Sequence, residues 1–293
     1  MKISIKPLLV ATILPLGMFA AGAQADFIDL FSDGGAIVSD VTDGAEADDT
    51  ENFSEVGSFN TILGGYRDLK VDTLTDGVDI NGNNECDVGD SCTTMTVNTA
   101  ANTLSFNNDA GVEGVGIVQW DGQDNSSALN IDSGINENFI TQDGCGAGCD
   151  RFEIEVLEAD QGFTFTVGIY TDADNWTEFD LVSSGNLGIQ TFLFSDFANA
   201  ALCGAPFPPA SGIAAMRCGG VDTGTGTGDQ VVDFTDVNAM QLIFNVNGGT
   251  TAVDLRIGAL TKTVPEPGAL ALFGLGLAAA GLARRRRSPT LNA

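Results

Sequence analysis

Histidine is absent from this chain of 293 residues, whereas aspartate and glutamate together number 40. Without histidine, the chain can form neither a Ser-His-Asp or Cys-His catalytic arrangement nor a His-ligated metal site. Carboxylate pairs are the catalytic groups that remain. Because acidic residues are so common here, their presence alone does not indicate an enzyme.

Basic residues are also scarce, since lysine and arginine together number only 12. Residues 26–263 hold six of them against 39 acidic residues, which gives this segment a formal charge of −33. Phosphate binding requires clustered lysine and arginine, so nucleic acid and anionic membrane surfaces are excluded as partners of the segment. A charge of this sign keeps a protein soluble and favours the binding of divalent cations.

Long apolar runs are confined to the two ends of the chain. At the N-terminal end, the basic residues Lys2 and Lys6 precede an apolar stretch, residues 8–21, and the small-x-small sequence Ala23-Gln24-Ala25 follows it. This order is that of a secretory signal peptide. We therefore expect residues 1–25 to act as a signal helix for the secretion translocon, and the mature chain to begin at Asp26.

The C-terminal run has three parts in a fixed order: Pro265-Glu266-Pro267, the charge-free residues 268–283, and the arginines Arg284, Arg285, Arg286 and Arg287. The prolines prevent helix on the N-terminal side of the run. Sixteen residues in a helix rise about 24 Å, a little less than a hydrocarbon core of about 30 Å. Arginines stay with anionic headgroups on the cytoplasmic side. The pattern predicts a marginal transmembrane helix over residues 268–283, with the bulk of the protein outside.

Residues 264–287 resemble the PEP-CTERM sorting domain of Gram-negative bacteria. The resemblance implies that exosortase, a membrane-embedded protease and transpeptidase, recognises Pro265, Glu266 and Pro267 and removes the tail, with the four arginines as its basic end. It also implies an inner-membrane intermediate, then the cell envelope, outer surface or extracellular matrix of a biofilm or exopolysaccharide producer. The alternative is a plain C-terminal anchor.

The cysteines form three close pairs inside Gly- and Asp-rich loops: Cys86 with Cys92, Cys145 with Cys149, and Cys203 with Cys218. Export into an oxidising compartment makes disulfides the default, although six cysteines allow fifteen pairings. We predict disulfides between nearest neighbours, which restrain the loops but do not cross-link the strands of the core. A zinc site is the alternative.

The loop around the first cysteine pair places oxygen-bearing side chains at alternate positions, namely Asp79, Asn81, Asn83, Glu85, Asp87 and Asp90. Ca²⁺ takes six to eight oxygen ligands from a loop that folds around it, so this loop is a candidate Ca²⁺ site. The spacing imitates the start of an EF-hand, but Asn84 stands where that loop requires glycine. The alternative is an Asx-rich turn closed by the disulfide.

Short β-like runs recur along residues 26–263 between Gly, Asn and Asp turns, and residues 151–157 and 162–170 alternate apolar and polar side chains. Strands are also predicted at residues 27–31, 62–71, 93–97, 103–106, 112–120, 128–131, 176–182 and 189–194, followed by an irregular region, residues 198–230, and a terminal hairpin of residues 233–246 and 251–260. These runs predict one all-β domain, an antiparallel β-sandwich of jelly-roll type. Its last strands loosely resemble galactose-binding and carbohydrate-binding-module jelly rolls.

Trp176 lies among carboxylates in residues 171–180. An exposed aromatic ring beside acids is typical of a sugar-binding platform, because the ring packs on a pyranose while the acids bind its hydroxyls. The alternative is that Trp176 begins the strand 176–182 and faces the core. Trp120 has the same two interpretations.

Three functions remain open. The first is an exported, non-catalytic envelope or matrix protein that binds glycan, such as exopolysaccharide, or Ca²⁺. The second is a purely structural protein of the biofilm matrix. The third is a glycoside hydrolase or lyase with two carboxylates about 5 to 10 Å apart in a groove.

Overall fold

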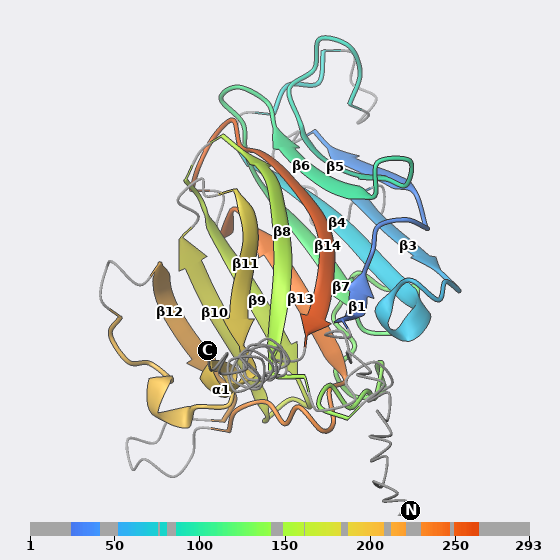
Figure 1. Ribbon diagram of the computed structural model, residues 1–293. Coiled ribbons are helices and arrows are strands. Elements are labelled where there is room, and N and C mark those ends of the chain that lie inside the picture. Colours follow the sequence, from blue (N-terminus) through green and yellow to red (C-terminus); the bar gives the residue numbers. More distant parts are fainter. Residues whose placement is uncertain are drawn as a thin grey trace, which may run out of the picture. The chain divides into compact units, whose positions relative to one another are not determined.

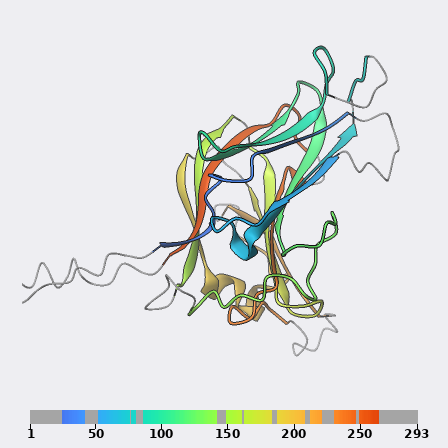
Figure 2. The same cartoon turned by 90° about the vertical axis from the view of Figure 1, so that its right-hand side faces the viewer.

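A computed structural model describes residues 25–41, 52–75, 77–80, 86–141, 149–160, 162–182, 187–207, 212–220, 230–246 and 249–263. All of these residues belong to one compact unit, Gln24–Pro265. Its strands form two antiparallel sheets that enclose one apolar core (Figure 1). Figure 2 shows the two layers from the edge.

The first sheet, called sheet A, has the strand order β11-β8-β14-β6-β5-β2, and β1 also pairs with β14. Its strands are β1 (Ala25–Asp29), β2 (Ala36–Asp40), β5 (Thr93–Asn98), β6 (Thr103–Asn108), β8 (Arg151–Ala159), β11 (Gly188–Leu193) and β14 (Asp254–Thr263). The long strand β14 therefore contacts three others, and it contains the last residues that the structure describes.

The second sheet, called sheet B, has the order β12-β10-β9-β13-β7-β4-β3. Its strands are β3 (Phe53–Gly57), β4 (Tyr66–Thr75), β7 (Glu113–Trp120), β9 (Thr164–Tyr170), β10 (Trp176–Val182), β12 (Ile213–Cys218) and β13 (Ala239–Phe244). The described helices are short: η2 (Leu63–Gly65), α1 (Phe194–Phe197) and η3 (Ala200–Leu202).

Strand alternation explains why the core forms between the sheets. In β9, Val167 and Ile169 point inward, and in β8 Phe152 and Ile154 point toward them from the other sheet. Phenylalanine supplies much of the packing, and the rings of Phe194 and Phe234 stack with centroids 4.3 Å apart. Each fully buried ring of this size contributes about 1.5–3 kcal/mol through the hydrophobic effect.

The two layers confirm the predicted all-β sandwich, and several strands lie where the sequence places them. Strand β10 has the predicted bounds, and β8 and β9 match the alternating runs within two residues at each end. The prediction was wrong at residues 128–131, which form no strand. It also missed β2, β3 and β12, whose patterns are short and interrupted by glycine or acidic residues.

The predicted terminal hairpin is wrong. Strand β13 pairs with β7 and β9 in sheet B, whereas β14 pairs with strands of sheet A. Both strands carry an apolar face, and they bury those faces by packing across the core rather than edge to edge. Asn245, which has a φ of +54°, begins the crossing and holds the connection through hydrogen bonds with Thr250.

Two of the three predicted disulfides are confirmed, Cys86–Cys92 and Cys203–Cys218. Cys149 is disulfide-bonded as well, but Cys145 lies outside the described residues, so that pairing stays a prediction. Among the described residues, no helix has the length and apolar character that crossing a membrane requires. The expected signal helix, residues 1–25, and the helix over residues 268–283 fall outside the described range, apart from Ala25.

Candidate functional site

A row of polar side chains crosses the outer face of sheet B, on the side opposite the core. The register aligns one residue from each strand, in the order Arg217, Glu178, Gly168, Gln241, Gln119, Asp68 and Glu55. Their chain neighbours, such as Val118 and Leu242, point into the core. We call this line of residues the polar row.

Most of the polar row is one hydrogen-bonded chain. Gln119 donates from Nε2 to Oε1 of Gln241 at 3.0 Å, and Gln241 donates to the Tyr170 hydroxyl at 3.2 Å. The Tyr170 hydroxyl donates in turn to Glu178. The Tyr170 ring lies back over Gly168, where a Cβ atom would stand 2.6 Å from the hydroxyl oxygen. Glycine is therefore required there for the chain to continue across β9.

The end of the polar row at the edge of the sheet is a charged cluster. Arg217 donates to Glu178 at 3.0 Å and forms a two-pronged contact with Asp180, whose second partner is the Thr166 hydroxyl. The Arg217 side chain is 44% exposed, so this end meets solvent. Burial and the Glu178 carboxylate raise the pKa of Tyr170, which keeps its hydroxyl a hydrogen-bond donor at neutral pH.

Trp176 begins β10, as the alternative interpretation predicted, but it does not face the core. It lies on the outer side with Glu178, half-buried, and its ring centroid is 6.2 Å from that of Tyr170. Trp120 does lie in the core, fully buried, and its indole nitrogen donates to Asp29 at 3.0 Å. The two tryptophans thus have different roles, and Trp176 is the one that a ligand can reach.

The opposite end of the polar row consists of acids alone. Carboxylate oxygens of Glu55, Asp68 and Asp124 lie within 4.8 Å of one another. Asp68 is only 1% exposed, and neither of its oxygens has a hydrogen-bond partner among the described residues. Asp121, the first residue after β7, is also buried, with Oδ2 bonded to the Asn130 amide at 2.7 Å and Oδ1 unpartnered in the described structure.

This crowding changes the titration of the buried acids. Burial raises the pKa of the Asp68 carboxyl to about 9, and the carboxyls of Asp121, Glu55 and Asp124 contribute to the rise. Burial likewise raises the pKa of Asp121 to about 6. The charged neighbours that raise the Asp68 pKa, namely Asp121, Glu55 and Asp124, are all acids.

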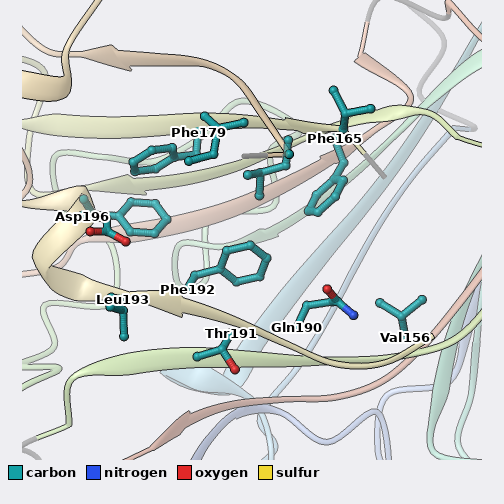
Figure 3. A pocket seen from close by; sticks show the side chains of 13 residues that line it. Val156, Phe165, Phe179, Gln190, Thr191, Phe192, Leu193 and Asp196 are labelled. Carbon is teal, nitrogen blue, oxygen red and sulfur yellow. The ribbon is translucent and has the colours of Figure 1, made fainter. Parts of the chain in front are cut away.

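A cavity of about 280 Å³ opens between the sheets, where the edge strands β11 and β12 leave them uncovered. Figure 3 shows the rings of Phe165, Phe179 and Phe192 around it, with Asp196 on the left and Gln190 on the right. Asp196 is the one carboxylate in its described lining. The cavity is therefore an apolar site and does not bring two acids together.

The two ends of the described chain lie side by side. Ala25 pairs with Thr263 and Asp26 with Lys262, so β1 begins where β14 ends. The Lys262 ammonium is buried, 3.1 Å from the Asp26 carboxylate and 4.5 Å from the centroid of the Phe139 ring. The first and last residues that the structure describes, Ala25 and Thr263, are therefore neighbours in sheet A.

The predicted Ca²⁺ loop is only partly described, because Asn81, Asn83 and Glu85 lie outside the described residues. Within the described part, Asp90 spends both carboxylate oxygens on backbone amides, those of Ile80 at 2.9 Å and Asp87 at 2.8 Å. These bonds connect Ile80 and Asp87 to Asp90 and so hold the two ends of the loop together. Ca²⁺ binding at Asp79, Asp87 and Asp90 stays a prediction. The residues of the predicted sorting signal and Ala23 lie outside the described range.

Sequence reasoning singled out Trp176 at one end of the polar row, but it missed the other residues of the row, because strand register assembles them from distant parts of the chain. One usable signal was Asp68 in the predicted strand 62–71. Asp68 is buried on the outer face of sheet B, and a buried position in a strand usually holds an apolar residue. Comparable acids occur throughout this chain, so the signal does not stand out.

Comparison with known proteins adds information on one segment. Residues 263–287 match the PEP-CTERM protein-sorting motif. This motif indicates an exported protein that is processed at the membrane by exosortase. This match confirms the resemblance of residues 264–287 to the PEP-CTERM sorting domain.

No curated protein matches the chain. Among solved structures, the carbohydrate-binding module CtCBM11, studied in solution with its dynamics and binding, is similar over 78% of this chain and 94% of its own. The identity is 8% and the TM-score 0.28, which is too low for any transfer of function.

Proposed function

We propose that this chain is an exported, non-catalytic protein of the cell envelope or extracellular matrix, with a jelly-roll-like sandwich as its mature body. The sorting motif at residues 263–287 supports export and processing. The observation that carries the proposal further is the pairing of Ala25 with Thr263. The expected signal peptide and the sorting tail leave the domain at adjacent points, as two tethers of one membrane-bound precursor would.

The domain ends where the motif begins, which suits removal of the tail. Strand β14 extends to Thr263, and only Val264 separates it from Pro265-Glu266-Pro267. Every described strand lies on the N-terminal side of that point. Cleavage at the tail therefore removes none of the sheet hydrogen bonds, and the processed protein keeps its fold.

The proposed non-catalytic role is supported by what the described sites contain. The cavity is lined by a single carboxylate, and the acids at the end of the polar row are packed around the buried Asp68. Glycoside hydrolysis needs two carboxyls that flank a substrate, with about 5 to 10 Å between them. The described lining of the cavity, with its single carboxylate, does not offer that arrangement.

Mass analysis of the protein in its host tests the sorting step. The wild-type protein should lack residues 1–25 and the tail, whereas Glu266→Ala should retain the tail in the membrane fraction. Pro289→Ala, a proline beyond the matched segment, should be processed normally. A wild-type protein found in the cytosol, uncut at both termini, would overturn the proposal.

Glycan binding is the second part of the proposal, and the exposed end of the polar row supports it. Trp176 offers an aromatic face there, and the Glu178 carboxylate and Arg217 guanidinium lie beside it as hydrogen-bonding groups. Rings and charged planar groups together are the usual means of binding a sugar. The expected ligand is a polysaccharide of the extracellular matrix.

Binding of the exopolysaccharide isolated from the host should be weakened at least about tenfold by Trp176→Ala, which corresponds to about 1.4 kcal/mol. Tyr66→Ala removes a half-buried aromatic residue from the far edge of the same sheet and should leave binding unchanged. Equal losses in the two variants, or no affinity of the wild type for the polysaccharide, would remove glycan binding and leave a purely structural matrix role.

A further inference from the structure

The acidic end of the polar row contains a buried carboxylate that the protein itself does not satisfy. Asp68 is 1% exposed, and both of its oxygens lack a hydrogen-bond partner in the described structure. A buried carboxylate without partners costs several kcal/mol, so native proteins pair it, protonate it or bind a metal ion with it. Asp68 therefore requires either a proton, which it would donate to the Asp121 carboxylate in a hydrogen bond, or a cation.

Two separate segments bring further carboxylates close to Asp68. Strand β3 places Glu55 opposite it in the sheet register, and the loop after β7 supplies Asp121 and Asp124. One oxygen from each of Glu55, Asp68 and Asp124 lies within 4.8 Å of the other two. Carboxylates repel one another at such distances, unless a cation or a proton lies between them.

The surrounding backbone holds these acids in place without neutralising them. Oε2 of Glu55 accepts hydrogen bonds from the amides of Asp124 at 2.9 Å and Asn125 at 2.6 Å. Oδ1 of Asp124 accepts from Ser126 at 2.9 Å. Each of these bonds involves one oxygen of its carboxylate. Both oxygens of Asp68 and Oδ1 of Asp121 are buried and accept no hydrogen bond in the described structure.

We propose that Glu55, Asp68, Asp121 and Asp124 bind a divalent cation of the Ca²⁺ type. The donor set consists of oxygen alone, which suits a hard cation and disfavours zinc, whose sites use thiolate or imidazole. The carboxylates come from two strands and a loop without octahedral regularity, which Ca²⁺ tolerates better than the stricter octahedral Mg²⁺ does. A bound ion would join the loop of residues 121–130 to the β3–β4 pair.

This proposal is independent of sorting and of glycan binding, and it concerns residues other than the loop of residues 79–90. Substitutions distinguish the two candidate cation sites. A Ca²⁺ ion at the acidic end of the polar row depends on Asp68, whereas an ion in the loop depends on Asp79, Asp87 and Asp90.

Calorimetric titration of the chelator-treated full chain with CaCl₂ in detergent tests the proposal. We expect saturable binding that Asp68→Asn weakens by at least about a hundredfold. Loss of a group that only hydrogen-bonds to a metal ligand lowers metal affinity by about 10–100-fold, and loss of a residue that binds the ion directly should cost at least as much. Glu55→Gln, a half-buried change at the rim, should weaken it to a lesser extent. Asp72→Asn, exposed on the same side of β4, is the matched control and should bind as the wild type does.

Crystals grown with CaCl₂ provide the second measurement, because a folding defect in a variant cannot affect them. An ion between the four carboxylates would support the proposal. A hydrogen-bonded Asp68–Asp121 pair without an ion would overturn it, as would calcium binding that survives Asp68→Asn and disappears in Asp90→Asn. MgCl₂ in place of CaCl₂ should bind more weakly, and equal affinity would contradict the assignment to Ca²⁺.

Discussion

Arg67 and Asp68 are consecutive residues of β4 that point to opposite faces of sheet B, and their surroundings differ sharply. On the inner side, Arg67 forms a fully buried ion pair with Asp29 at 2.7 Å, and that carboxylate also accepts from the Trp120 indole and the Phe31 amide. On the outer side, Asp68 is equally buried but accepts no hydrogen bond in the described structure.

The contrast separates a structural charge from one that depends on something else. Burial raises the pKa of Asp29, but three donors from its own chain, Arg67, Phe31 and Trp120, oppose that rise. Asp68 has acids as its influential neighbours, so the folded domain requires a proton or a cation there. Burial alone would class the two carboxylates together, and it is the inventory of partners that distinguishes them.

The inner pair should give the largest effect on stability. Arg67→Met leaves Asp29 buried and uncompensated, which we expect to lower the free energy of unfolding by about 3–5 kcal/mol. Urea denaturation measures this. Arg151→Met is the control, because Arg151 pairs with Asp150 at the surface and should cost at most about 1 kcal/mol. Adding Asp29→Asn to Arg67→Met should recover part of the loss, and a failure to recover any would mean that lost packing dominates.

The outer acid should make stability depend on pH in the calcium-free protein. The folded state holds the Asp68 proton up to a pKa of about 9, whereas the unfolded state releases it near 3.8. The stability that this proton provides is complete below pH 3.8 and is lost progressively as pH rises toward 9. Between pH 6 and 8 the loss should reach about 2–3 kcal/mol, at up to about 1.4 kcal/mol per pH unit.

Urea denaturation at a series of pH values in a chelating buffer measures this slope. Asp68→Asn should flatten it, and saturating Ca²⁺ should flatten it in the wild type as well. Asp72→Asn should keep the wild-type slope. A wild-type protein whose stability does not fall over this range would show that Asp68 is compensated by a group that the described residues do not include.

Asp26 offers an intermediate case, in which a buried base depends on a carboxylate at the edge of the domain. Lys262 is buried and its pKa is lowered by that burial, although the Asp26 carboxylate opposes the shift. Asp26→Asn should therefore destabilise the protein by about 1–3 kcal/mol, as for a buried hydrogen bond to a charged group. Thermal unfolding of the exported protein measures the loss, and Asp150→Asn at the surface serves as control. If the two changes lowered stability equally, the Lys262–Asp26 ion pair would contribute no more than an ion pair at the surface.

The sequence predicted the fold class because alternation is local. Phe152, Ile154 and their polar neighbours show the period of a half-buried strand without reference to any other segment. Strand pairing is not local, and for that reason β13 and β14 read as a hairpin although they lie in different sheets. The same limit applies to the site. The loop of residues 79–90 has oxygen-bearing side chains close together in the sequence, and for that reason it was predicted to bind Ca²⁺. Glu55, Asp68 and Asp124 are far apart in the sequence and come together only in the folded domain.

Gln119 lies between the satisfied and unsatisfied parts of the polar row, and it should give the smallest effect. It donates to Gln241 on one side and lies opposite Asp68 on the other. Gln119→Leu leaves the Gln241 carbonyl without this donor and should cost about 1–2 kcal/mol, whereas the double variant Gln119→Leu/Gln241→Leu should cost less than the sum of the single changes. Urea denaturation of the four proteins gives the coupling energy, which should be about 1 kcal/mol.

If Asp68 is held by its cation, Gln119→Leu should leave calcium affinity within about twofold of the wild type. A large loss of affinity would instead mean that the glutamine chain orients the acidic cluster, and the two halves of the row would then act as one unit.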